Sequence, residues 1–149
     1  MKIALAQLNP TVGDLDGNLE KLSSQLAEIS RADTDLVILP ELFLTGYPPR
    51  DLLYDDSFID RCDYALIKLK KISSNYPKTA ILIGTVTRCQ LKHGKKLYNS
   101  AILIENGEVI FTQNKTLLPA YDVFDENRYF ESANEIKACP FRDEVLGIS

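Results

Sequence analysis

Two apolar runs, residues 3–8 and 36–39, stand on either side of a stretch with helical periodicity, and this order limits the fold more than any other feature of the chain. The second run, Leu-Val-Ile-Leu, is apolar without alternation, as in parallel strands that are covered on both faces. Over residues 18–29, leucine and isoleucine recur at the spacing of one helix face. We therefore predict two buried strands, joined by a helix in a right-handed parallel unit, and an α/β fold.

The next segment begins with a loop and continues as a second helix and a third strand. Residues 45–56 hold a glycine, two prolines and three aspartates, a composition typical of loops. Ser57, with Asp60 three residues later, forms the pattern of a helix N-terminal cap. Residues 80–86 are again almost wholly apolar. We predict a helix from Ser57 onward and a buried strand at 80–86.

The second half of the chain opens with a hairpin. Asn106-Gly107, a pair that favours a tight turn between two strands, separates apolar runs at 98–104 and 109–111. Residues 116–144 show no clear periodicity and carry several aromatic residues among acidic ones. We predict a long loop there, and such loops are uncommon in a compact domain unless they form part of a site.

Composition excludes several functional classes. A length of 149 residues suits a single domain, and a net charge of −4 with scattered lysines and arginines offers no basic stripe for a phosphate backbone. No apolar run approaches the roughly 20 residues that a membrane helix needs, and the N-terminus lacks the pattern of a signal peptide. We expect a soluble, cytoplasmic protein that binds neither nucleic acid nor a membrane.

The three cysteines, Cys62, Cys89 and Cys139, lack the spacing of a zinc site or of a disulfide framework. We interpret them as reduced thiols, with Cys62 on the apolar face of a helix and Cys89 near a strand end. Cys139 precedes a proline in the predicted loop, without the strand-to-helix turn that exposes a nucleophile. None of the three is a convincing nucleophile.

Two charged residues directly follow predicted strands. Glu41 comes after the run at 36–39, and Lys115 comes after the hairpin. An ionisable group at such a position needs a partner or a chemical role. Taken alone, each residue is more often a solvated surface residue, so the surrounding sequence decides the interpretation.

That surrounding sequence resembles a known family. The stretches concerned are 38–41 (Ile-Leu-Pro-Glu), 46–53 (Gly-Tyr-Pro-Pro-Arg-Asp-Leu-Leu), 114–119 (Asn-Lys-Thr-Leu-Leu-Pro) and 123–130 (Val-Phe-Asp-Glu-Asn-Arg-Tyr-Phe). Together they resemble the nitrilase, or carbon-nitrogen hydrolase, superfamily, and more narrowly the N-terminal glutaminase domain of glutamine-dependent NAD+ synthetases. The resemblance implies an α-β-β-α sandwich, of which residues 1–149 would be the first half, with no synthetase domain.

The resemblance also implies a Glu-Lys-Cys triad, in which a cysteine attacks the side-chain amide of glutamine and releases ammonia. Glu41 matches the general base, Lys115 the residue that stabilises the oxyanion, and Glu126 a supporting glutamate. Tyr47 and Tyr121 match tyrosines that help to hold glutamine.

The nucleophile itself is expected just beyond Ser149, because residues 146–149 look like the opening of the strand that carries it. We therefore expect the isolated chain to be inactive. The sequence contains no glycine-rich ATP loop of the synthetase type, so we expect no cofactor and no metal here, and assign ATP and magnesium to a synthetase domain. The expected partners are glutamine, further copies of the chain, and a separately encoded remainder of the enzyme.

Two other interpretations stay open. The chain could belong to an ordinary nitrilase-family amidase, although the stretch at 46–53 favours the synthetase branch. It could also be a non-catalytic interaction module that keeps the nitrilase fold. Downstream sequence that encodes the cysteine would separate the enzyme interpretations from this third one.

Overall fold

The computed structural model describes residues 1–121 and 124–149, and a five-stranded sheet forms its centre. The first three strands are parallel, and the last three form an antiparallel meander, so the predicted strand-helix-strand unit and hairpin are both confirmed. In sheet order the strands are β1 (Ile3–Leu5), β2 (Leu36–Ile38), β3 (Ala80–Arg88), β4 (Leu97–Glu105) and β5 (Glu108–Asn114).

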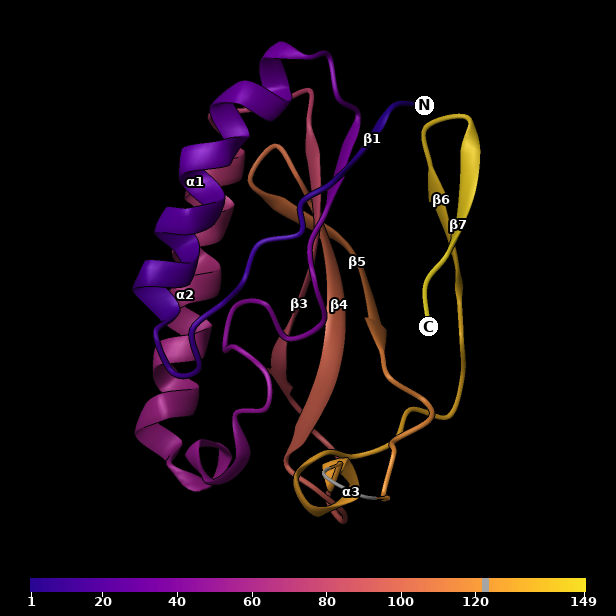
Figure 1. The fold of residues 1–149 in the computed structure, drawn as a ribbon. Coiled ribbons are helices and arrows are strands. Elements are labelled where there is room, and N and C mark those ends of the chain that lie inside the picture. Colours follow the sequence, from indigo (N-terminus) through magenta and orange to yellow (C-terminus); the bar gives the residue numbers. More distant parts are fainter. Residues whose placement is uncertain (122–123) are drawn as a thin grey trace.

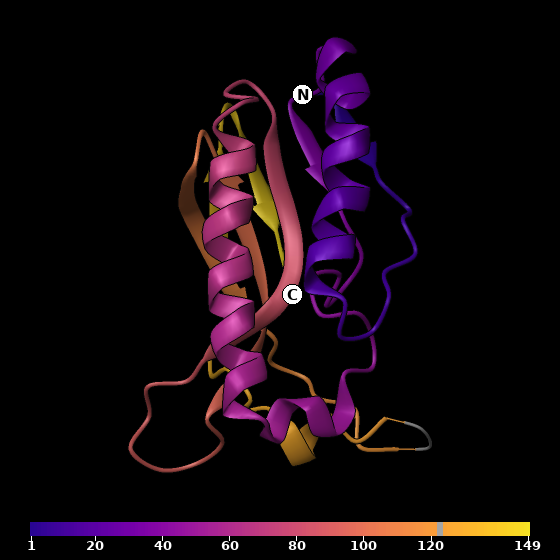
Figure 2. The same cartoon turned by 90° about the vertical axis from the view of Figure 1, so that its left-hand side faces the viewer.

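Two long helices cover one face of this sheet, as Figure 2 shows from the helix side. Helix α1 (Leu15–Arg31) begins three residues before the predicted range 18–29. It buries Leu19, Leu22 and Leu26, part of the spacing that predicted it, and also Leu15. Helix α2 (Asp56–Ser73) begins two residues earlier than the predicted cap implied, because its cap is Asp55 instead of Ser57. The Asp55 carboxylate accepts a hydrogen bond from the Ser57 backbone N–H at 2.9 Å, an N-cap contact that aspartate makes well.

A hairpin of two short strands, β6 (Ala138–Phe141) and β7 (Glu144–Gly147), lies against the other face of the sheet (Figure 1). Cys139, Phe141 and Ile148 pack there against apolar residues of β2, β3 and β4. The described residues therefore form three layers, helices, sheet and hairpin, which fit the predicted α/β sandwich. The chain ends beside the central sheet, at about its mid-height in Figure 1.

The prediction of a loop without regular structure at 116–144 was wrong for residues 126 onward. That segment contains a single helical turn, α3 (Glu126–Tyr129), and strand β6, so that Cys139 lies on a strand and is buried. Elements of four residues are too short to show periodicity, and β6 is defined by its pairing with β7. The loop predicted at 45–56 likewise contains a 3-10 helix, η1 (Arg50–Tyr54). Val123, part of the family motif, lies outside the described residues.

The first strand is less buried than its composition suggested. Strand β1 is at the edge of the sheet and spans three residues, with Ile3 and Leu5 exposed by 45% and 68%. Ala4, between them, points the opposite way and packs against the helix-side core. No helix in the described part of the chain is long and apolar enough to cross a membrane.

The turn after β2 rests directly on β3. Leu39 donates its backbone N–H to Leu82 at 2.9 Å, and Leu44 donates to Gly84 at 3.2 Å. A Cβ atom added to Gly84 would lie 2.3 Å from the Leu42 nitrogen and 2.8 Å from the Glu41 Cα. Only a glycine at this position lets the turn that carries Glu41 lie so close to the sheet.

We expect Gly84→Ala to lower the free energy of unfolding by about 1–3 kcal/mol, because the methyl group collides with backbone that has no room to move. Urea unfolding followed by circular dichroism measures this loss. The control is Gly147→Ala, where no heavy atom lies within 4 Å of the added Cβ. Equal midpoints for the two variants would contradict the close approach.

Candidate active site

The side chains of Glu41 and Lys115 meet although the strands that they follow are not neighbours. Two strands, β3 and β4, separate β2 from β5 in the sheet. The turn that crosses Gly84 carries Glu41 toward β4, and the Lys115 backbone N–H donates to the Asn99 carbonyl on that strand at 2.8 Å. As a result, the Lys115 Nζ lies 2.8 Å from the Glu41 Oε1.

A second carboxylate holds the same ammonium. Glu126, in the first turn of α3, is only 5% exposed, and its Oε2 and Oε1 lie 3.0 Å and 3.2 Å from the Lys115 Nζ. The Tyr47 hydroxyl donates to Glu126 Oε1 at 3.2 Å. Glu126 Oε2 accepts no well-aligned hydrogen bond among the described residues, so the Lys115 ammonium is its charge partner. One cation thus links two carboxylates from distant parts of the chain.

The protonation states follow from burial and from these contacts. Burial opposes the charge on Lys115, but the bonds to Glu41 and Glu126 outweigh it and raise the pKa of Lys115 above its ordinary value. Burial, together with the nearby charge of Glu126, raises the pKa of Tyr47 to about 12. At neutral pH, Lys115 is therefore an ammonium and Tyr47 is a protonated hydrogen-bond donor.

A cavity of about 220 Å3 opens beside this group, between the central sheet and the C-terminal segment. Glu41, Lys115 and Asn99 form its polar side, Ile38 and Leu82 are among its apolar lining residues, and Ser149 also lines it. Such a combination of apolar walls with a few convergent polar groups is typical of small-molecule sites. The cavity lies on the face of the sheet away from the helices.

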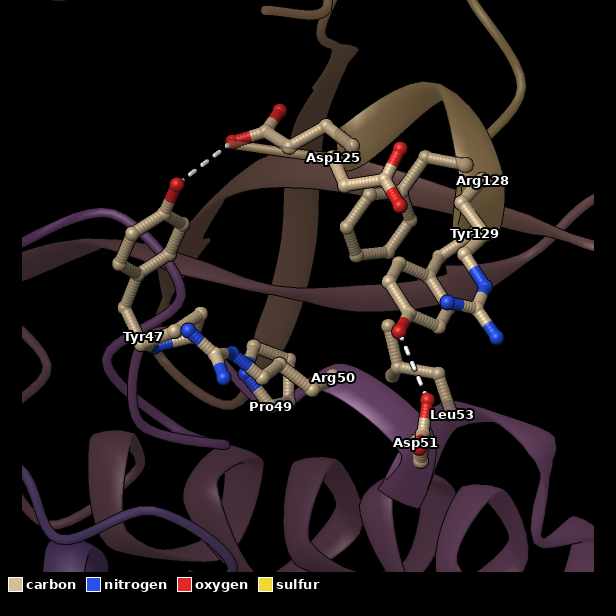
Figure 3. Close-up of a pocket in the computed structure, with 11 residues that line it drawn as sticks. Tyr47, Pro49, Arg50, Asp51, Leu53, Asp125, Arg128 and Tyr129 are labelled. Atoms are coloured by element: carbon tan, nitrogen blue, oxygen red, sulfur yellow. Dashed lines mark hydrogen bonds between the residues drawn. The ribbon is translucent and has the colours of Figure 1, made fainter. Parts of the chain in front are cut away.

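A second cavity, of about 250 Å3, has Tyr47 and Glu126 among its lining residues, and Figure 3 shows a close-up of it. Its walls include Pro49, Arg50 and Tyr129, and the Tyr129 hydroxyl donates to Asp51 at 2.8 Å. Figure 3 shows Tyr47 and Tyr129 reaching into this space from opposite sides.

Four of the five predicted site residues come together, namely Glu41, Lys115, Glu126 and Tyr47. Tyr121 does not join them through any hydrogen bond of the described residues. It is 69% exposed, and its ring meets that of Phe124 edge-on at a centroid distance of 5.6 Å. Within residues 1–121 and 124–149, no cluster of three or more histidine, cysteine or acidic residues could hold a metal ion.

The sequence interpretation missed Asn99. This residue is buried on β4, and its Nδ2 donates to Glu41 Oε1 at 2.6 Å. The sequence did contain a signal that could have identified Asn99, because a polar residue interrupts an otherwise largely apolar strand there. It was weak, since a single asparagine in a strand more often bonds to nearby backbone than to a distant carboxylate.

Comparison with known proteins gives a consistent picture. The chain matches the carbon-nitrogen hydrolase family over residues 2–147. It is 43% identical, over 150 residues, to a glutamine-dependent NAD(+) synthetase from Synechocystis sp., a match that covers 99% of this chain and 26% of the relative. The chain therefore spans about a quarter of the length of that synthetase.

Two solved structures agree with this family match. A glutamine-dependent NAD+ synthetase from Acinetobacter baumannii superposes with a TM-score of 0.82 at 32% identity, covering 97% of this chain and 26% of the other. An amidase from Nesterenkonia sp. superposes with a TM-score of 0.83 at 24% identity, covering 99% and 54%. The likeness to the amidase shows a shared fold. This chain spans about half of the amidase's length.

We expect Lys115→Met to lower the free energy of unfolding by about 2–3 kcal/mol at pH 7, because it leaves the buried Glu126 carboxylate without a counter-ion. The loss should shrink as the pH falls toward 5, since protonation removes the uncompensated charge. Adding Glu126→Gln should restore much of the stability. Denaturant unfolding at both pH values measures these effects.

The control for that experiment is Lys137→Met, which removes a lysine whose partner Glu135 is equally exposed. Such a surface pair contributes less than about 1 kcal/mol, so little change is expected. A loss in Lys115→Met that is identical at both pH values would contradict the role of the Glu126 charge.

Proposed function

We propose, from the premise that the chain belongs to the carbon-nitrogen hydrolase family, that it supplies the base and the oxyanion-stabilising cation of a glutamine-hydrolysing site. The observation that carries the proposal is the position of the Lys115 ammonium, held between Glu41 and Glu126 beside a cavity of small-molecule size. The kinship with glutamine-dependent NAD(+) synthetases supports glutamine as the proposed substrate, with ammonia as the product passed on.

Two of the charged residues, Glu41 and Lys115, suit the steps of amide hydrolysis, and Glu126 supports Lys115. Glu41 removes the proton of a thiol, which then attacks the amide carbon of glutamine. Lys115 stabilises the negative oxygen of the tetrahedral intermediate. Protonated Glu41 returns its proton to the departing ammonia, and water hydrolyses the remaining thioester. Glu126 keeps the ammonium in place, and Tyr47 and Tyr121 contact the substrate.

The thiol comes, in this proposal, from a segment that follows Ser149. Ser149 lines the same cavity as Glu41 and Lys115, so the next residues along the chain start beside the base. The buried thiols of the chain are poorly suited to the role. Burial raises the pKa of Cys62 to about 12 and also raises the pKa of Cys139, whereas a nucleophile needs a readily formed thiolate.

The remaining features of the enzyme are assigned to the portion of the synthetase relatives that this chain does not cover. Residues 1–149 are proposed as the N-terminal part of a glutaminase domain, in a cytoplasmic homo-oligomer. ATP and magnesium would bind in a separate synthetase domain, where ammonia completes the amide of NAD+.

An amidase without a synthetase domain is the second candidate, because the Nesterenkonia amidase superposes over almost the whole chain. The two candidates predict different substrates. A synthetase forms NAD+ from its acid precursor only with ATP, and it accepts glutamine or free ammonium as nitrogen source. An amidase would release ammonia from simple amides without ATP.

The experiment measures ammonia release from glutamine by the complete gene product that contains these residues. Glu41→Gln is expected to lower kcat by about 10²–10⁴-fold, because the base is lost while the shape is kept. Glu20→Gln, on the exposed surface of α1, serves as the matched control and should leave kcat unchanged. Wild-type activity in Glu41→Gln would contradict the proposal.

The 149-residue chain by itself should release no ammonia from glutamine, because it has no suitable thiol beside the base. A homogeneous preparation of that chain that is active, and that loses its activity in Cys139→Ala, would overturn this expectation.

A further inference from the structure

The two oxygens of the Glu41 carboxylate are in different surroundings. Oε1 accepts two hydrogen bonds, from Asn99 Nδ2 at 2.6 Å and from Lys115 Nζ at 2.8 Å. No hydrogen bond of the described residues reaches Oε2. An oxygen that already accepts two charge-assisted bonds is the weaker base of the two.

Asn99 is placed to create this asymmetry. It is buried at the middle strand of the β3-β4-β5 meander, paired with Val86, and so its amide group has little freedom. A carboxylate can only accept hydrogen bonds, which requires the NH2 group of Asn99 to face Glu41. The backbone carbonyl of the same residue accepts from the Lys115 N–H at 2.8 Å. One residue thus holds both the base and the start of the loop that carries the cation.

Lys115 alone would not fix the carboxylate. Its ammonium has three rotatable donors on a flexible stem, and could follow either oxygen if the carboxylate turned. Rotation about the last bond of a glutamate side chain meets only a low barrier. A rigid amide donor on a strand removes that freedom, because its bond is lost when Oε1 moves away.

We propose that Asn99 is a positioning residue that holds Oε1 of Glu41, so that Oε2 is the oxygen that transfers the proton. The inference rests on the proposed function, since it concerns the base of that reaction. The S–H bond of the thiol breaks as the O–H bond forms at Oε2, leaving a thiolate and a neutral carboxyl. That O–H bond later breaks as an N–H bond forms on the departing nitrogen. Both bonds to Oε1 persist through the two transfers.

The test compares Asn99→Ala and Asn99→Asp in the complete gene product, with glutamine as substrate. Asn99→Ala should lower kcat about 10–100-fold with little change in KM, because the base is misplaced while the substrate contacts remain.

Asn99→Asp keeps the shape of the side chain and replaces the donor by an acceptor. At neutral pH it should be less active than Asn99→Ala, because two carboxylates then face each other. As the pH falls toward 5, the new carboxyl becomes protonated and can donate, so its activity should rise relative to that of Asn99→Ala. A residue that only fills space would show no such reversal.

The matched control is Thr87→Val, which removes a 2.6 Å hydrogen bond to Ser100 within the same pair of strands without touching Glu41. Its kcat and pH profile should stay those of the wild type. Circular dichroism checks that each variant is folded, and if Asn99→Asp fails to fold, the loss of kcat at nearly unchanged KM in Asn99→Ala carries the test.

A folded Asn99→Ala protein with wild-type kcat would overturn the inference. The proposed function is judged separately by Glu41→Gln. If that variant is inactive while Asn99→Ala is normal, the function stands and the positioning role fails. If Glu41→Gln retains full activity, the proposed function fails, and the role of Asn99 with it.

Discussion

The ammonium of Lys115 is shared by the carboxylates of Glu41 and Glu126, and the arrangement of the site depends on this contact. Glu126 is buried, and a buried carboxylate without a cation would be strongly unfavourable. The lysine therefore joins three segments that no regular sheet hydrogen bonds connect, the turn after β2, the end of β5 and the turn of α3. The same contact keeps Lys115 charged at neutral pH.

The layered fold explains why Glu41 and Lys115 face a cavity. The helices occupy one face of the sheet, where Leu22, Leu26 and Phe58 form part of the main core. The β6-β7 hairpin covers only part of the other face. The cavity beside Glu41 lies on that second face, with Ser149 among its lining residues.

Within the site, rigid and flexible partners have different roles. Asn99 on β4 offers a fixed donor, whereas Lys115 offers a mobile cation that Glu126 and Glu41 hold from two sides. Gly84 allows the Glu41 turn to lie against β3, within reach of both. The position of the Glu41 carboxylate is thus defined by packing as much as by charge.

The amino-acid sequence by itself determined the parallel unit, the hairpin and the family motifs. Apolar periodicity reports which face of an element is buried, and the Asn106-Gly107 turn reports a local backbone geometry, with φ of 48° and 81°. The motifs also identified Glu41, Lys115, Glu126 and Tyr47, which the fold then brought together.

Only the tertiary structure decided how these residues meet. The contact between Glu41, after β2, and Lys115, after β5, spans two intervening strands, and no local sequence pattern encodes such a pairing. The pairing of β6 with β7, the exposure of Tyr121 and the bond from Asn99 to Glu41 depend in the same way on segments far apart in the chain. The physical reason is that periodicity records burial within one element, whereas a side chain's partner is chosen by the packing of several elements at once.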